Sequence, residues 1–271
     1  MPDRWPSFET LLLHEEHARL TVTFNRPQVK NALTHAMMTE LRAVMDALPG
    51  RRDLRVVVFR GAGGNFCAGG DLGFMARTPP APPAGGGPDP TVAAYRMFGD
   101  VLLALDAVPQ AVVSLVEGAA AGGGFAIACS SDVTIALADA VFAMPEARSG
   151  FIPGQVIPAV TRRIGATHAR RLVVTGDRLD GRQALALGVA HYCVDTLEQA
   201  EAMLAQVLAQ IHRCAPNAVA AAKRLVLRVG TEPDSRLLDE GAQVLVDLLR
   251  QPEAQEGIAA FFEKRPPAWA R

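Results

Sequence analysis

The chain has 271 residues, a length that favours one large domain, or one domain with an appendage, over several. Its 27 basic and 28 acidic side chains leave a formal net charge of −1, so no global field is available to hold a nucleic-acid backbone or an anionic membrane. Hydrophobic residues make up 49% and charged residues 20%, a balance that can bury a core and argues against wholesale disorder.

The N-terminal residues and the spacing of the cysteines indicate the compartment in which the protein works. Residues 1–10 lack the basic stub and apolar stretch of a signal peptide, and no run of about 18 apolar residues follows. Cys67, Cys129, Cys193 and Cys214 are far apart, without a C-x-x-C pair or a histidine at zinc-finger spacing. We therefore expect a cytoplasmic protein with reduced cysteines, no disulfide framework and no metal site.

The first third of the chain predicts a strand, a helix and a strand. Residues 18–25 alternate and are β-branched, and residues 55–60 enclose the short buried strand VVVF. Between them, apolar side chains recur at helical spacing over residues 32–48, with Asn31 as the expected N-cap. This order indicates an α/β fold.

The middle third continues the pattern after a stretch rich in proline and glycine. Residues 78–91 predict a surface loop that is either a tolerated insertion or a lid. A helix over 92–107 and a strand over 111–116 follow, and residues 125–129 resemble the opening of a buried helix. Residues 133–136 predict another strand, and 140–144 form a further apolar segment.

From residue 166 onward the sequence becomes helical. Amphipathic segments end at Gly176 and Gly188, and helices are expected over 197–212 and 218–227. We expect a core of repeated β-β-α units over residues 1–195 and a helical C-terminal region over 196–271.

Two glycine clusters follow predicted strands. Gly69-Gly70 comes after the strand over 55–60, and Gly122-Gly123-Gly124 comes after the strand over 111–116. Backbone N–H groups at strand ends and helix N-termini can donate to a developing oxyanion, although close backbone packing also explains glycine. A dinucleotide fingerprint is not favoured because Phe66 holds the third glycine position, and no G-x-S-x-G elbow of a hydrolase occurs.

One carboxylate stands out. Glu146 directly follows an apolar stretch, in the segment Pro145 to Pro153. Apolar surroundings raise the pKa of an acid and allow proton exchange near neutral pH, whereas the alternative is a solvated acid at a loop or helix start. The six histidines form no cluster that suggests catalysis or metal binding.

Taken together, these motifs resemble the enoyl-CoA hydratase/isomerase (crotonase) superfamily. The matching segments are NRP followed by NAL at residues 25–33, the strand and loop VVVFRGAGGNFCAGGDL, GAAAGGGFAIACSSD, PEARSGFIP and FFEKRP at residues 261–266. They run in family order over residues 8–266. The resemblance implies a spiral of β-β-α turns, with C-terminal helices that build trimers, commonly paired into hexamers.

The resemblance also implies an acyl-CoA thioester as substrate, with CoA as part of the substrate and no metal or redox cofactor. The two oxyanion-hole N–H groups fall on Gly70 and Gly123, and the second of two family glutamates matches Glu146. Ala68 and Asp71, on either side of the Gly69-Gly70 pair, are expected to bind substrate.

A further pair of positions lies near the C-terminus. Phe261 and Lys264 match family positions that reach a CoA adenine pocket, often from a neighbouring subunit. The alternative is a frayed, solvated tail.

The sequence departs from the family at two places. The first family glutamate would fall where the chain has Ala126, so either Glu146 alone serves a hydratase or the protein is an isomerase with a single acid. In place of a glycine-rich run, residues 152–160 read IPGQVIPAV, a pattern that resembles methylglutaconyl-CoA and isohexenylglutaconyl-CoA hydratases. We therefore expect hydration of a β-branched 2-enoyl-CoA, with Gln155 as hydrogen-bonding partner of the water; an acyl-CoA-binding protein without activity is the third alternative.

Overall fold

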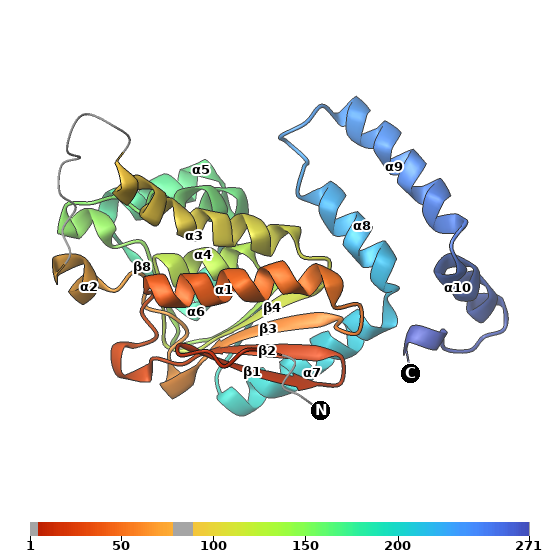
Figure 1. The fold of residues 1–271 in the computed structure, drawn as a ribbon, viewed down its shortest axis with the longest axis horizontal. Coiled ribbons are helices and arrows are strands. Elements are labelled where there is room, and N and C mark those ends of the chain that lie inside the picture. The colour runs from red at the N-terminus through yellow and green to blue at the C-terminus, as the bar shows by residue number, and fades with distance from the viewer. Residues whose placement is uncertain (1–4, 78–88, 271) are drawn as a thin grey trace.

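The computed structural model describes residues 5–77 and 89–270, and a six-stranded sheet forms its centre (Figure 1). The strands lie in the order β1-β2-β3-β4-β6-β9, where β1 is antiparallel to β2 and the remaining neighbours are parallel. In a second sheet, of order β5-β7-β8, β5 is parallel and β8 antiparallel to β7. The strands are β1 Leu11–Glu16, β2 Arg19–Phe24, β3 Val56–Gly61, β4 Ala111–Val116, β5 Ala119–Ala121, β6 Val133–Leu137, β7 Val141–Ala143, β8 Arg178–Leu179 and β9 Tyr192–Val194.

Helices cover both faces of the main sheet. Figure 1 shows α1, α3 and α4 on one face and α7 on the other. The α-helices are α1 His35–Ala47, α2 Leu72–Arg77, α3 Pro90–Ala107, α4 Gly123–Ser130, α5 Ile157–Thr175, α6 Gly181–Ala186, α7 Leu197–Arg213, α8 Pro216–Val226, α9 Asp234–Leu249 and α10 Pro252–Phe262.

The central strands are apolar because they are buried on both sides. In β3, Val57 and Phe59 join the cluster under α1, α3 and α4, whereas Val56 and Val58 face the cluster that contains Leu204 of α7. Alternation of side chains along a strand sends successive residues to opposite faces, so a strand covered on both faces reads as an uninterrupted apolar run. This double burial fixes the sheet and, with it, the loops at its edges.

Most predicted elements are present, and the α/β fold class is confirmed. The predicted strands 18–25, 55–60, 111–116 and 133–136 correspond to β2, β3, β4 and β6, and the predicted helices 92–107, 197–212 and 218–227 to α3, α7 and α8. Gly176 and Gly188 adopt positive φ of 59° and 76° where helices end, as expected. Of the loop predicted over 78–91, residues 78–88 lie outside the described residues, and Asp89 caps α3 through its side chain.

The expected helix cap at Asn31 is wrong. The N-cap of α1 is Thr34, whose hydroxyl accepts a hydrogen bond from the Met37 N–H at 3.3 Å. Asn31 is fully buried at a φ of 58°, and its amide accepts from the Arg26 N–H and donates to two carbonyls of the loop after β3. Its side chain is therefore committed to joining loops and is not free to cap a helix.

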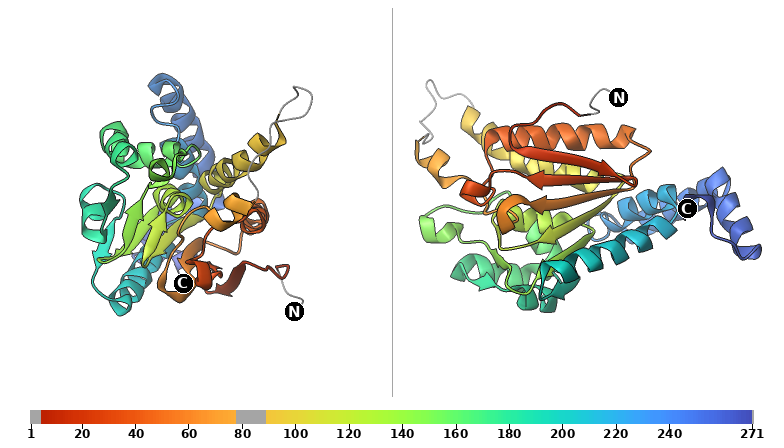
Figure 2. Two further views of the ribbon diagram at one scale, coloured as in Figure 1. Left: turned by 90° about the vertical axis from the view of Figure 1, so that its left-hand side faces the viewer. Right: turned by 90° about the horizontal axis from the view of Figure 1, so that it is seen from below.

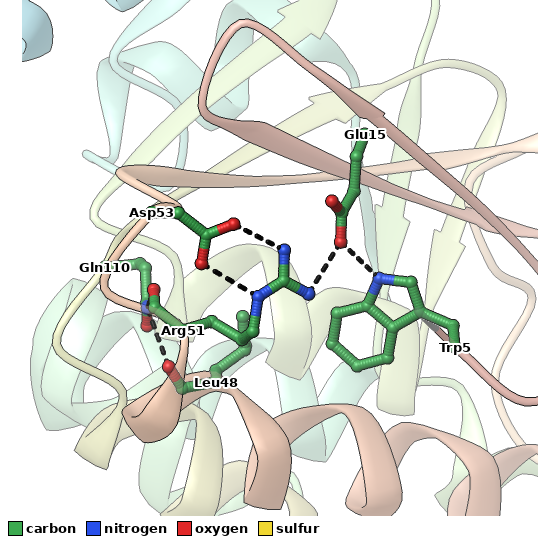
Figure 3. A network of polar contacts seen from close by, with 6 residues as sticks. All are labelled: Trp5, Glu15, Leu48, Arg51, Asp53 and Gln110. Atoms are coloured by element: carbon green, nitrogen blue, oxygen red, sulfur yellow. Dashed lines mark hydrogen bonds and ion pairs between the residues drawn. The ribbon is translucent and has the colours of Figure 1, made fainter. Parts of the chain in front are cut away.

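Side-chain contacts join the loops at one end of the main sheet, the edge at which its parallel strands begin (Figure 3). The Arg51 guanidinium donates to both carboxylate oxygens of Asp53, at 2.9 and 2.8 Å, and pairs with Glu15 at 2.7 Å. It also lies over the Trp5 ring, whose Nε1 donates to the same Glu15 carboxylate. The Gln110 amide donates to two carbonyls of the neighbouring turn, so this edge is fixed by charged and amide groups.

The last three helices, α8 to α10, form an arm that projects from the sheet (Figures 1 and 2). Lys223 of α8 anchors the arm, since its ammonium lies 2.8 Å from the Asp132 carboxylate and donates to the Gln110 carbonyl. Leu238, Leu245 and Phe262 are more than half exposed, at 73%, 58% and 77%. Within the described residues, no helix combines the length and apolarity needed to cross a membrane.

Candidate active site

Gly70 lies in the loop that follows β3, where it pairs with the segment before α1. The Leu33 N–H donates to the Gly69 carbonyl at 2.7 Å, and the Asp71 N–H donates to the Leu33 carbonyl at 3.0 Å. In a parallel bridge of this kind, the bonds belong to the neighbours of the central residue, so the N–H of Gly70 itself points away from Leu33. This N–H is free to face a ligand.

Gly123 is the first residue of α4, so its N–H has no acceptor within the helix and lies at the positive end of the helix dipole. Apolar side chains occupy the space beside it. A Cβ at this position would stand 2.3 Å from Cδ1 of Leu33 and 3.0 Å from Cζ of Phe98. The absence of a side chain therefore lets two apolar groups close over the start of the helix.

Gly122 brings Glu146 to the same place. It has a φ of 49°, which favours glycine, and a Cβ there would stand 2.6 Å from Oε1 of Glu146 and 3.5 Å from Cα of Gly69. The two glycine clusters and the carboxylate thus meet, although Glu146 comes from the segment after β7 and the clusters follow β3 and β5.

Glu146 is a partly buried acid at the start of a 3₁₀ turn, Glu146–Ser149. Burial raises the pKa of its carboxyl above the ordinary glutamate value, and a hydrogen bond from its own backbone N–H partly offsets the rise. Among the described residues, its buried Oε2 atom has no hydrogen-bond partner. A carboxyl with a raised pKa holds its proton to a higher pH than an ordinary glutamate, which suits a group that both accepts and returns protons.

No second acid stands at the family position on α4. Ala126 is fully buried, two residues beyond Gly124. A Cβ on Gly124 would come within 2.2 Å of the Cys67 carbonyl, so the helix packs directly on the loop after β3. The arrangement leaves Glu146 as the acid that contacts the glycine clusters.

Ala68 and Asp71, on either side of the Gly69-Gly70 pair, help to hold this loop. The Ala68 N–H donates to the Lys30 carbonyl at 2.9 Å. The Asp71 carboxylate pairs with Arg26 at 3.0 Å, and the same guanidinium donates to the Ala32 carbonyl at 2.6 Å. Substrate binding by Ala68 and Asp71 stays a prediction, while these contacts give both a part in positioning Gly70.

Gln155 extends to α3. Its Oε1 atom lies 2.2 Å from the place that a Cβ of Gly99 would take. The side-chain oxygen therefore lies against α3. The sequence analysis expected it beside the water and did not predict this contact. That role stays a prediction.

Phe261 and Lys264 lie on the arm, and Figure 1 places α10 at the opposite end of the molecule from α2, which follows Gly70. Phe261 is 76% exposed and helps to line an apolar hollow of about 390 Å³, together with Trp269 and residues of α8 to α10. Within one chain, these two residues are not brought together with the glycine clusters and Glu146.

Two contacts of the site escaped the sequence analysis. Phe98 and Gly99 connect α3 to Gly123 and to Gln155, respectively. The sequence predicted the helix that carries both residues but not the segments they contact, because it does not say which elements α3 crosses. A glycine inside a helical pattern was the available signal for Gly99, since such a glycine often marks close packing.

In the part of the chain that the structure describes, no three histidine, cysteine, aspartate or glutamate side chains gather in a way that could hold a metal ion.

Known proteins resemble this chain over most of its length. A family model for enoyl-CoA hydratase/isomerase matches residues 15–271. The structure of Pseudomonas aeruginosa AtuE matches with a TM-score of 0.92 and 46% identity, over 97% of this chain and 100% of that one. An enoyl-CoA hydratase/isomerase from Marinobacter aquaeolei matches with a TM-score of 0.92 and 41% identity, over 97% and 99% of the two chains. Carnitinyl-CoA dehydratase of Proteus mirabilis is 32% identical over 269 residues, 96% of this chain and 98% of that protein.

Proposed function

The chain belongs to the enoyl-CoA hydratase/isomerase family, and we propose that within it the protein adds water across the 2,3 double bond of a β-branched 2-enoyl-CoA. The observation that carries this proposal is the convergence of Glu146 with the Gly70 loop and the N-terminus of α4. Water chemistry is supported by the name of a relative, the carnitinyl-CoA dehydratase at 32% identity.

The two backbone N–H groups act on the thioester. Those of Gly70 and Gly123 donate to the thioester oxygen, which becomes negatively charged as an enolate forms. Donors fixed by the backbone need no reorganisation at that moment. Their stabilisation is therefore larger for the transition state than for the substrate.

Glu146 moves the protons. As a carboxylate it accepts a proton from water while the water oxygen bonds to C3 and the electrons of the double bond pass to the thioester oxygen. It then returns a proton to C2, which restores the carbonyl. Since Ala126 supplies no second carboxylate, Glu146 performs both transfers, and its raised pKa suits an acid that must also act as a base. No step calls for a metal or a redox cofactor.

A single acid also suits a second candidate reaction. An isomerase that moves a double bond from the 3 to the 2 position needs one group to carry a proton between C4 and C2, and Ala126 is the observation that favours it. The pattern of residues 152–160 is our reason to place hydration first.

We further propose that a second copy of the chain completes the CoA site, in a trimer or hexamer. The exposed apolar side chains of α9 and α10 are a surface that a partner would cover. Lys264 could then reach a phosphate and Phe261 the adenine of CoA bound at the neighbouring site, which neither can reach within its own chain.

Product mass is the decisive measurement. The protein is mixed with a panel of branched and straight 2- and 3-enoyl-CoAs, and products are identified by mass spectrometry. We expect products one water heavier, with faster turnover of β-branched substrates. Products of unchanged mass and shifted double bond would replace the hydratase with the isomerase, and binding without any turnover would leave an acyl-CoA-binding protein.

A further inference from the structure

Helix α4, which begins at Gly123, is short and is built mostly from small residues. Its eight residues read GGFAIACS, so it is about 12 Å long at a rise of 1.5 Å per residue. Phe125 packs edge-on against Phe142 with ring centroids 5.6 Å apart, but glycine, alanine and serine present few ridges to a neighbouring element. The contacts at its two ends therefore contribute much to the orientation of α4.

The guanidinium of Arg163 holds the C-terminal end of this helix. Arg163 lies on α5, which packs on α4. Its Nε donates to the Cys129 carbonyl at 3.0 Å, and its Nη2 donates to the Ser131 carbonyl. Its Nη1 lies 3.2 Å from Nε2 of His191. The last carbonyls of an α-helix have no partner within the helix, and a planar guanidinium can hold two of them in a fixed geometry.

Arg163 also ties α4 to the part of the chain that carries the acid. Its helix, α5, follows the segment that begins at Glu146, with no strand between them. The C-terminal end of α4 is thus joined to α5, while Gly122 at the N-terminal end lies against the Glu146 carboxylate. A change in the direction of α4 would alter the place of the Gly123 N–H relative to Glu146.

We propose that Arg163 is a positioning residue: by holding the C-terminal end of α4, it directs the Gly123 N–H at the other end toward the thioester oxygen. A helix of two turns is kept rigid by its own hydrogen bonds, so a tilt or rotation at one end reaches the other. A donor stabilises a developing oxyanion only from about 2.7–3.1 Å, so a small displacement matters. This inference rests on the proposed function, which makes Gly123 one of the two donors.

A chromophoric thioester tests the proposal without turnover. The absorption of cinnamoyl-CoA moves to longer wavelength when hydrogen bonds polarise its carbonyl, and spectra of the saturated protein are recorded directly after mixing. In Arg163→Gln, this red shift should fall to half or less of the parent value. With the preferred enoyl-CoA, kcat should fall about tenfold while KM stays within threefold. A purely structural loss would lower the fraction of active protein and leave the shift of each bound probe unchanged.

Two further variants separate the geometry of Arg163 from its charge. Arg162→Gln is the matched control, because this neighbour on α5 is 49% exposed and pairs with Asp106 at 2.9 Å; the red shift and kcat should match those of the parent. Arg163→Lys keeps the charge but not the planar set of donors, so the red shift should stay reduced. An undiminished shift in Arg163→Gln, or full restoration in Arg163→Lys, would overturn the inference. If Arg163→Gln does not fold, Arg163→Lys decides by the same criterion.

Failure of the proposed function is recognised separately. A red shift in the parent, without addition of water to any enoyl-CoA, would reject hydration and leave the comparison of the Arg163 variants intact. A parent that binds cinnamoyl-CoA without any red shift would overturn the inference, because the Gly123 N–H would then polarise no carbonyl.

Discussion

The two edges of the main sheet, where the parallel strands begin and where they end, are held together by different kinds of contact. Where the parallel strands begin, charged and amide side chains join the loops, as Arg51 does with Glu15 and Asp53 (Figure 3). Where they end, backbone meets backbone at Gly69 and Gly122, and a buried carboxyl oxygen of Glu146 has no partner among the described residues. Paired charges stabilise the fold, whereas an unpaired acid beside free N–H groups is an arrangement suited to chemistry.

Loss of the acid should have the largest effect. Glu146→Gln keeps the shape of the side chain but removes its titratable proton, so kcat should fall by about a hundredfold or more. Turnover measured with the preferred enoyl-CoA checks this expectation. A variant within threefold of the parent would show that this edge of the sheet is not where protons are transferred.

The same variant should be more stable at neutral pH. Because burial raises the pKa of Glu146 in the folded chain, its contribution to stability is full below the ordinary glutamate pKa of the unfolded chain and is lost as the pH rises through the higher pKa of the folded chain. Glutamine does not titrate. The melting temperature of Glu146→Gln relative to the parent should therefore rise as the pH is raised from about 4 to about 8. A difference in melting temperature that does not change with pH would contradict the burial of an ionisable carboxyl.

Alanine substitutions at Gly122 and Gly70 should show whether a glycine is needed for close backbone packing or only for a flexible loop. Gly122→Ala strains a positive φ and places a methyl group against Glu146, so activity should fall more than about tenfold and the free energy of unfolding by about 1–3 kcal/mol. Gly70→Ala is the control, because its Cβ would stand 3.5 Å from Cε of Met75 and leave the N–H in place. Activity assays and melting curves of both variants decide the matter; equal losses would refute the distinction.

A change at the opposite edge should alter stability without altering chemistry. Arg51→Met removes the paired charge and its contact with Trp5, and should lower the free energy of unfolding by about 1–2 kcal/mol. Thermal melting measures the loss, and kcat at a temperature where the variant is folded should match that of the parent. A large drop in kcat would mean that the two edges are coupled.

The sequence predicted many of the longer elements because their patterns are local, although it did not predict α9 (Asp234–Leu249) or β1 (Leu11–Glu16). Alternation in residues 19–24 and helical spacing in residues 90–107 arise from burial of one face, which the sequence records directly. Strands β5, β8 and β9 have only two or three residues, and their pairing depends on partners distant in the chain. Asn31 was misassigned for a related reason: a residue type that suits a helix cap also suits the junction of three loops.

The site was predicted unevenly in the same way. Gly70, Gly123 and Glu146 stand in motifs, so the resemblance to a family brought them out together, and the structure places their segments in contact. The contacts of Phe98 with Gly123, and of Gln155 with Gly99, depend on how α3 crosses the neighbouring segments. No spacing within α3 encodes that crossing.

The position of the arm has a consequence in genetics. Because α10 and the Gly70 loop lie at opposite ends of one chain (Figure 1), the proposed shared site would take its acid from one copy and its adenine contacts from another. Two defective alleles, one altered at Glu146 and one in the arm at Phe261, would then encode subunits that assemble a fraction of sound sites when made in the same cell. Neither allele expressed alone would give active sites. If each chain instead formed its whole site by itself, expressing the two alleles together would restore no activity.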